Sequence, residues 1–195
     1  QGVPRNRDAC FRGHRYLRFV DMSVASLILA AGRGTRFGAD KRLALMPDGR
    51  TMLAASLQLY AHVCHSVLVV IRCDDLTARE VAASCGVQYI ECPDADLGMG
   101  HSLAQGARAL SAMSGLDGVL IGLADMPMVS LSTLQALQEA LLASDRPVVP
   151  VYQGTFGQPR GLPARYLPSL TSLKGDEGAR HLLDWRSEAL ALVVE

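Results

Sequence analysis

A glycine- and cation-rich segment follows the first apolar run of the sequence, and its composition fits the binding of an anion. Residues 24–29 read as a buried strand. Gly32 and Gly34 then allow the backbone to turn tightly and bring its N–H groups close to a ligand. Arg36 and Lys41 add cationic donors that suit phosphate oxygens. The segment therefore predicts a phosphate-binding loop at the end of a strand.

This loop matches neither of two common glycine-rich phosphate motifs. In a P-loop the lysine follows a glycine, whereas Lys41 follows Asp40. A dinucleotide-binding loop needs G-x-G-x-x-G, and here the third glycine, Gly38, comes one residue late. The acid expected about 20 residues further on is replaced by an apolar helical pattern. A nicotinamide-dependent oxidoreductase is therefore the weakest alternative.

Asp125 is a second candidate site residue, because it follows the apolar run 119–123 almost at once. A carboxylate directly after a buried strand is costly unless it lies at the rim of the sheet or has a partner. A divalent cation is such a partner, since Mg²⁺ favours one or two carboxylates together with phosphate oxygens. Ser130 is better placed than Asp125 to cap the following helix. The pattern predicts a Mg²⁺ or Mn²⁺ ligand at Asp125.

The elements that must position these residues alternate along the chain. Apolar runs predict strands at 24–29, 67–71, 87–91, 119–123, 148–152 and 189–194. Helical spacing of leucine and alanine lies between most of them. This alternation predicts an α/β fold with three layers, in which helices cover both faces of a mostly parallel sheet. Ligands bind beyond the carboxyl ends of such strands, where the glycine-rich loop and Asp125 both fall.

Two further segments carry candidate residues whose roles stay open. Gly98 precedes a helix that we expect to begin near Ser102, with N–H donors directed toward the site. Ser102 is either the cap of that helix or a ligand. Residues 157–163 are rich in glycine and proline, which a simple turn also explains. Asp176 precedes a helical pattern, so it is a candidate helix cap.

Composition excludes several classes of protein. The 19 basic and 19 acidic residues cancel, which gives no support for nucleic-acid binding. The five cysteines are odd in number and lack C-x-x-C spacing, so we expect reduced thiols in a cytoplasmic protein. No apolar run approaches the ~18 residues that span a membrane. Residues 1–21 are expected to be a basic extension, disordered or not native, which leaves 22–195 as a single domain.

The whole pattern from Leu29 to Lys41, L-A-A-G-x-G-x-R-F-G-x-x-K, resembles the signature of molybdenum-cofactor-type nucleotidyltransferases. Within that group the chain looks most like the molybdenum cofactor cytidylyltransferases. The resemblance implies a Rossmann-like sheet of the nucleotide-diphospho-sugar transferase type. It also implies transfer of CMP from CTP to the phosphate of the molybdenum-pterin cofactor, with release of pyrophosphate. Ala31 favours CTP over GTP by this analogy.

The resemblance also implies roles for individual residues. Nucleotide contacts would come from Leu29, Ala30, Ala31, Gly32, Gly34, Gly98 and Ser102. Catalytic groups would be Arg36, Lys41 and Asp125. The acceptor side would contain Gly157, Pro159, Asp176 and Arg180, with Asp125 and Asp176 as metal ligands. The sequence departs from the family pattern at Cys92, Ala124 and Gln158, which stand where asparagine, glycine and histidine are usual.

Three alternatives to this function share most of the same residues. The nucleotide could be GTP, or the acceptor could be a sugar or alcohol phosphate. The chain could also be a non-catalytic carrier of the molybdenum cofactor. The resemblance implies an enzyme of the xanthine-dehydrogenase type as the client. The charge balance and the short apolar runs lead us to expect no nucleic-acid or membrane partner.

Overall fold

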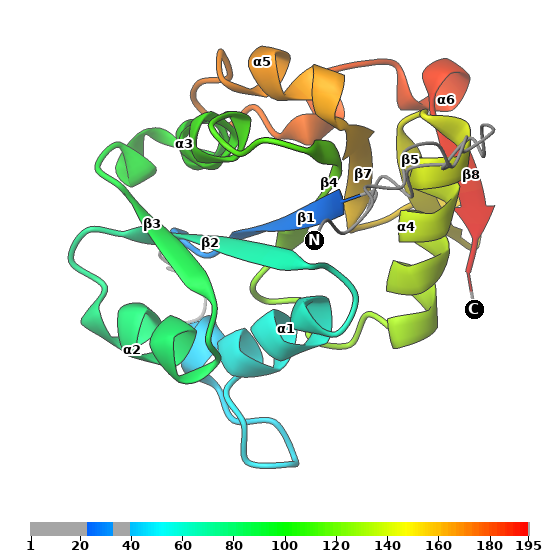
Figure 1. Cartoon of the computed structure of the whole chain (residues 1–195). Coiled ribbons are helices and arrows are strands. Elements are labelled where there is room, and N and C mark those ends of the chain that lie inside the picture. The colour runs from blue at the N-terminus through cyan, green and yellow to red at the C-terminus, as the bar shows by residue number, and fades with distance from the viewer. Residues whose placement is uncertain (1–22, 33–39, 195) are drawn as a thin grey trace, which may run out of the picture.

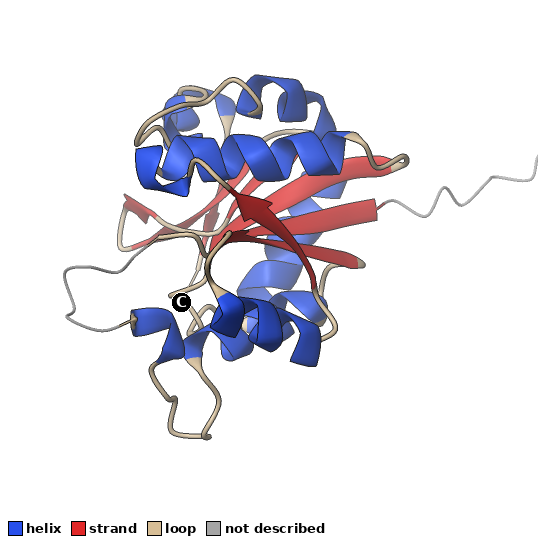
Figure 2. Cartoon of the chain, turned by 90° about the vertical axis from the view of Figure 1, so that its left-hand side faces the viewer, coloured by secondary structure: helices blue, strands red, loops and turns tan. Residues whose placement is uncertain are grey.

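A computed structural model describes residues 23–32 and 40–194, in which one eight-stranded sheet is covered by helices on both faces (Figures 1 and 2). The strand order is β3-β2-β1-β4-β7-β5-β6, and β8 pairs with β5. The strands are β1 (Ser23–Leu29), β2 (Ser66–Arg72), β3 (Gln88–Cys92), β4 (Leu116–Leu123), β5 (Val148–Tyr152), β6 (Thr155–Phe156), β7 (Arg160–Pro163) and β8 (Leu190–Val193). The α/β class with a central sheet is confirmed.

The half of the sheet that carries the glycine-rich loop is parallel. β1 pairs in parallel with both β2 and β4, and β2 pairs in parallel with β3. β1, β2 and β4 are largely apolar and buried because helices cover both of their faces, whereas β3 lies at the edge and is partly exposed. The chain runs from β1 outward to β3 and then returns to the other side of β1 at β4. That reversal creates a crevice at the carboxyl ends of β1 and β4.

The other half of the sheet is mixed, which differs from the mostly parallel sheet that the sequence predicts. β7 runs antiparallel to both β4 and β5, whereas β8 is parallel to β5. A simple turn is one of the explanations that the sequence leaves open for residues 157–163, but residues 160–163 form β7. Pairing with β4 creates this strand, and Gly161 permits the close approach of β5, since a Cβ there would overlap the side chain of Val148.

Helices complete the outer layers. α1 (Met52–Ala61), α2 (Leu76–Ser84) and α4 (Leu131–Ser144) pack on one face of the sheet, and α3 (Met99–Ser111) and α5 (Leu167–Leu170) pack on the other (Figure 1). Trp185, at the start of α6 (Trp185–Glu188), belongs to the α3 side of the core. The predicted cap of α4 is confirmed, because the Ser130 side chain accepts a hydrogen bond from the backbone N–H of Thr133.

No helix within residues 23–32 and 40–194 is long and apolar enough to cross a membrane.

Candidate nucleotide-binding site

The carboxyl ends of β1 and β4 bring the two main sequence segments together. Leu29 lies beside Leu123 in the parallel register. The backbone N–H of Ala124 donates to the carbonyl of Leu29 over 3.1 Å, and the N–H of Ala30 donates to Val70 on β2 over 2.9 Å. The start of the glycine-rich loop is therefore fixed by the sheet beside the segment that carries Asp125.

A cavity of about 400 Å³ opens at this point, and we call it the β1–β4 cavity. The predicted site residues that line it are Leu29, Ala30, Ala31, Gly32, Lys41, Gly98, Ser102, Asp125 and Asp176. They come from five separate parts of the chain. Predicted nucleotide-binding, catalytic and metal-binding residues thus surround one space.

Lys41 and Asp125 form an ion pair across the mouth of this cavity. Lys41 Nζ lies 3.3 Å from Asp125 Oδ2, and the two side chains are 35% and 43% exposed. An ion pair this exposed contributes little to stability, so its members can exchange partners at low cost. The ammonium can turn to a phosphate oxygen and the carboxylate to a cation, which is the pair of contacts that a metal-bound triphosphate requires.

Arg42, which no sequence pattern singles out, holds the two ends of the glycine-rich loop in place. The buried guanidinium donates through Nη1 to the carbonyl of Ala30 and through Nε to Asp40 over 2.9 Å. Nη2 also donates to Asp75, the capping residue of α2, over 2.7 Å. Ala30 and Asp40 flank the loop, so one side chain ties its two ends together.

The charges around Arg42 favour its ionised form and that of its partner. The hydrogen bond from Arg42 is the main cause that lowers the pKa of Asp40. Burial opposes the charge of Arg42 itself, but its hydrogen bonds to Asp40 and Asp75 outweigh that effect and raise its pKa. This cluster is consequently a charged anchor rather than a group that titrates during a reaction.

The start of α3 forms another wall of the β1–β4 cavity. α3 begins at Met99 with Gly98 as its cap residue, so Ser102 lies inside the first turn. Of the two alternatives left open for Ser102, the helix cap is therefore excluded. The N–H of Gly100 donates to the carbonyl of Gly175 over 2.7 Å. The residues around Gly175 are thereby docked against the helix start, and they carry Asp176 into the cavity wall.

Asp176 is exposed, and it does not cap a helix. The next helical turn, 179–181, has Gly178 as its cap residue, so the prediction of Asp176 as a helix cap is wrong. Within 23–32 and 40–194, no group of three or more His, Cys, Asp or Glu side chains is arranged to hold a metal ion. Asp125 and Asp176 nevertheless line one cavity, and two carboxylates suit Mg²⁺ when phosphate oxygens supply further ligands.

The close packing of α3 against the Gly175 segment leads to a prediction. A Cβ at position 100 would lie 2.5 Å from the carbonyl oxygen of Lys174. We expect Gly100→Ala to lower the free energy of unfolding by about 1–3 kcal/mol, as overpacking does, and also to weaken nucleotide binding, because Asp176 must move. Urea denaturation and equilibrium nucleotide titration measure the two effects.

Gly106→Ala is the matched control for this prediction. Its Cβ would overlap Leu27 in the core, on the same helix but away from the cavity. We expect a loss of stability without a loss of nucleotide affinity in the folded protein. Equal losses of affinity in both variants would contradict the role given to the contact between α3 and Gly175.

A second cavity, of about 490 Å³, adjoins the first, and we call it the Arg180 cavity. The two share Leu29, Met99, Leu123 and Asp176 as lining residues. The second cavity is also lined by residues that do not line the first, among them Gln158, Gly178 and Arg180. Two of the predicted acceptor-side residues, Asp176 and Arg180, thus lie together.

The other predicted acceptor-side residues lie elsewhere. Gly157 lines a third cavity, of about 520 Å³, together with Asp125 and Met128. Pro159, two residues further along the chain than Gly157, is buried. Gln158 lines both the second and third cavities, so this segment separates them.

Gly34 and Arg36 belong to residues 33–39, which lie outside the described residues, as does the predicted extension 1–21.

Comparison with known proteins is consistent with a site of this kind. Residues 26–190 match the family model of the MobA-like NTP transferase domain. The chain is 36% identical over 169 residues to the purine catabolism protein PucB of Bacillus subtilis (strain 168), a match that covers 82% of this chain and 80% of PucB.

A second relative is much longer. The chain is 37% identical over 130 residues to the bifunctional protein GlmU of Sphingopyxis alaskensis (strain DSM 13593 / LMG 18877 / RB2256). That match covers 66% of this chain and 28% of GlmU, so it spans less than a third of that relative.

A solved structure has the same fold. Rv0371c from Mycobacterium tuberculosis H37Rv superposes with a TM-score of 0.74 at 23% identity, over 89% of this chain and 88% of that chain. Rv0371c has also been solved as a complex with manganese.

Proposed function

Because this chain belongs to the MobA-like NTP transferase family, we propose that it transfers CMP from CTP to the phosphate of the molybdenum-pterin cofactor and releases pyrophosphate. The activity class, nucleotidyl transfer, comes with the family. The observation that carries the proposal is the β1–β4 cavity, in which Lys41, Asp125 and Asp176 face the end of a glycine-rich loop.

The residues of this cavity fit nucleotidyl transfer without a covalent enzyme intermediate. An oxygen of the acceptor phosphate attacks the α-phosphorus of CTP, the new P–O bond forms, and the bond to the β-phosphate breaks. Pyrophosphate leaves with the electron pair. The attacking oxygen is already ionised, so no general base is needed. Lys41 would neutralise charge on the leaving phosphates, and positioning supplies most of the rate.

A divalent cation fits the carboxylates that line the cavity. Asp125 and Asp176 would hold Mg²⁺ or Mn²⁺, and the bound cation would neutralise charge on the triphosphate. A structural relative solved with manganese supports the choice of metal class. Chelation by EDTA is expected to stop pyrophosphate release, and added Mg²⁺ or Mn²⁺ to restore it.

The identity of the nucleotide and the acceptor rests on sequence resemblance. Ala31 lies in the cavity wall at the position that resembles cytidylyl rather than guanylyl members. The matches to the molybdenum-cofactor pattern continue through the segments around Asp125, Gly157 and Asp176. The relationship to PucB, which is named as a purine catabolism protein, supports membership of the transferase family and suggests a role in purine catabolism. Delivery of the product to a client enzyme of the xanthine-dehydrogenase type is part of this proposal.

Pyrophosphate release with each nucleotide tests the assignment. CTP, GTP, ATP and UTP are offered in parallel with Mg²⁺, either with molybdenum-loaded pterin or with a sugar phosphate as acceptor. We expect pyrophosphate release only when CTP is combined with the molybdenum-loaded pterin. Release with GTP would overturn the assignment of the base, and release with the sugar phosphate would overturn the acceptor. Tight pterin binding without any release would favour a carrier instead.

Lys41 is predicted to contribute chiefly to triphosphate binding. Lys41→Ala removes a charge-assisted contact, and we expect it to lower kcat/KM for CTP about 10- to 100-fold. Its exposed ion pair with Asp125 contributes little to folding, so the melting temperature should hardly change. Steady-state kinetics check the first effect and thermal unfolding the second. An unchanged kcat/KM would remove Lys41 from the site.

A further inference from the structure

Arg160, at the start of β7, is a buried cation, and two of its donor atoms lack a hydrogen-bond partner in the described part of the chain. The residue is only 8% exposed. Its Nε and Nη1 atoms are buried and have no hydrogen-bond partner among the residues that the structure describes. Burial, with a smaller contribution from Arg180, lowers the pKa of Arg160. A buried charge of this kind lowers the stability of the fold unless a partner compensates it, so the presence of Arg160 at this position calls for an explanation.

Arg160 lies against the Arg180 cavity. It pairs with Ile121 across the antiparallel β4–β7 ladder, so both side chains stand on the same face of the sheet. Ile121, Ala179 and Arg180 line the cavity. The guanidinium carbon of Arg160 lies 4.5 Å from the centroid of the Trp185 ring. Trp185 in turn donates through its indole N–H to the carbonyl of Ala179 over 3.1 Å. The guanidinium is thereby held directly behind lining residues of the cavity, of which Arg160 itself is not one.

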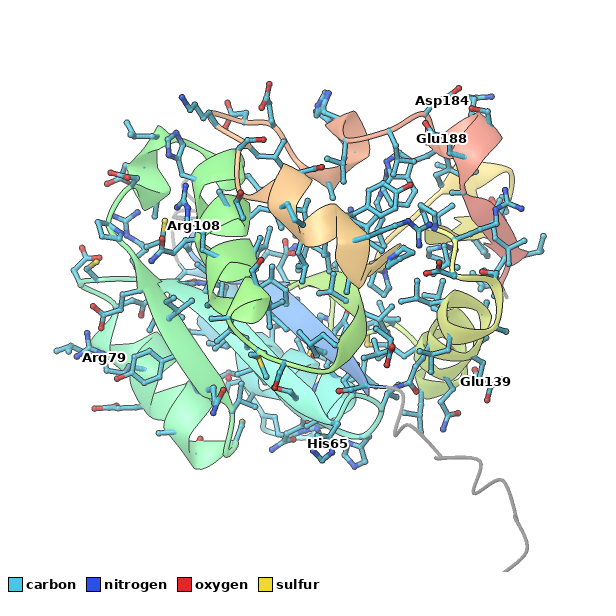
Figure 3. All side chains as sticks on the ribbon, turned by 45° about the horizontal axis from the view of Figure 1, so that its top comes forward. His65, Arg79, Arg108, Glu139, Asp184 and Glu188 are labelled. Carbon is cyan, nitrogen blue, oxygen red and sulfur yellow. The ribbon has the colours of Figure 1, made fainter. Side chains whose placement is uncertain are left out.

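The nearby carboxylates of α6 do not neutralise this cation. Asp184 and Glu188, at the two ends of the Trp185 turn, are exposed (Figure 3). Asp184 accepts hydrogen bonds from Arg186 and Ser187, and Glu188 accepts one from the N–H of Asp184. Both acids are therefore engaged locally.

A second polar group beside Arg160 also lacks a partner. The Oε1 atom of Gln158 is buried without a hydrogen bond among the described residues, and Gln158 lines the same cavity. Arg160, behind the wall, thus supplies unpartnered guanidinium donors for an anion, and Arg180 adds a second guanidinium that lines the cavity itself. Gln158 supplies an amide oxygen for an N–H or O–H group. A substrate that carries both kinds of group would satisfy all of these atoms at once.

We propose that Arg160, together with Arg180, binds an anionic group of the acceptor substrate in the Arg180 cavity and makes the enzyme selective for a charged acceptor. The inference rests on the proposed function for the identity of that substrate. Gln158 accepts an N–H or O–H of the same molecule. Arg160 touches the acceptor but takes no part in the bond changes at the α-phosphorus.

If Arg160 serves binding, its buried charge should make the folded protein less stable than an uncharged side chain of the same length would. Arg160→Met preserves the length of the side chain and its packing on Trp185, but removes the buried charge. We expect its melting temperature to equal or exceed that of the wild type, because groups retained for binding are often not optimal for folding. A purely structural arginine would behave in the opposite way, and its loss would lower the melting temperature by several degrees.

Trp185 provides a direct readout of binding, since it is the one tryptophan of the sequence. Wild-type protein is titrated with inorganic phosphate at constant ionic strength while tryptophan fluorescence is followed. We expect a saturable change, with affinity weakened at least tenfold in Arg160→Met and partly retained in Arg160→Lys. A wild-type protein without response, or equal affinity in all three proteins, would overturn the proposal.

Arg165→Met is a matched control. Arg165 also stacks on an aromatic ring, that of Tyr166 at 5.2 Å, but it is exposed and paired with Asp145 over 2.6 Å. We expect this variant to bind phosphate like the wild type. A loss equal to that of Arg160→Met would show that the response is a general effect of charge, and would overturn the proposal.

The failure of this inference can be told apart from the failure of the proposed function. In Arg160→Met we expect the affinity for CTP to stay within about twofold of wild type, while KM for the molybdenum-pterin acceptor rises at least tenfold. A phosphate response that depends on Arg160 in a protein that does not use CTP would refute the proposed function alone. CTP turnover with an acceptor KM that is unchanged in Arg160→Met would refute this inference alone.

Discussion

Asp125→Asn is expected to lower the rate of nucleotidyl transfer by about a hundred- to a thousandfold, the scale of losing one group that stabilises developing charge. The amide keeps the shape of the side chain but cannot neutralise a cation. The residue follows β4 and faces Lys41 at the mouth of the β1–β4 cavity, so both the metal and the triphosphate depend on its charge. Pyrophosphate release under saturating CTP and Mg²⁺ measures the effect.

The fold of Asp125→Asn should remain intact. Its side chain is 43% exposed and its ion pair is of the kind that contributes about 0–1 kcal/mol. Asp48→Asn is a suitable control, because Asp48 forms an exposed ion pair with Arg50 away from the cavities. We expect full activity in that variant. Full activity in Asp125→Asn would remove this carboxylate from the mechanism.

Arg42→Met is expected to have the largest effect on stability, with a loss of about 3–5 kcal/mol, as seen when one member of a buried ion pair is removed. The substitution leaves the carboxylate of Asp75 buried without its cation and releases the carbonyl of Ala30. Because Ala30 and Asp40 flank the glycine-rich loop, the affinity for CTP should fall as well. Chemical denaturation and nucleotide titration test both parts.

Arg50→Met provides the comparison for Arg42→Met. Arg50 bonds its neighbour Asp48 in much the same local geometry, but both side chains are exposed. We expect no measurable change in stability and no change in nucleotide affinity. Similar losses of stability in the two variants would contradict the view that the burial of Arg42 makes it an anchor.

The parallel half of the fold could be predicted from sequence because its signals are local. β1, β2 and β4 are continuous apolar runs, and the helices between them have regular apolar spacing. Parallel strands place their carboxyl ends at one edge, so the meeting of the segment around Gly32 with Asp125 follows from the alternation alone. For that reason the sequence was sufficient to predict that the start of the glycine-rich loop and Asp125 lie close together.

The features that escaped prediction depend on contacts between distant parts of the chain. β7 is four residues long and contains glycine and proline, and it becomes a strand by pairing with β4. Arg42 reads as a surface charge in sequence, yet its partner Asp75 lies 33 residues away. Asp176 precedes an apparent helical pattern, but the bond between Gly100 and Gly175 docks its segment on α3 instead.

Arg160 belongs to the same class of unpredicted features. Nothing local in the segment around Gln158 indicates that an arginine there is buried, because its burial follows from β7 formation and from the stack on Trp185. A cation of this kind in sequence is most simply read as a solvated surface charge. Its missing partners become visible only once the surrounding walls are in place.

A single-turnover reaction with labelled CTP tests the central claim most directly. CTP that carries a radioactive label on the α-phosphate is mixed with the protein, Mg²⁺ and molybdenum-loaded pterin, and the products are separated. Attack at the α-phosphorus in the β1–β4 cavity predicts that the label moves to the pterin and that unlabelled pyrophosphate is released. Label that stays with free CMP or CDP, or that remains in CTP, would contradict nucleotidyl transfer to this acceptor.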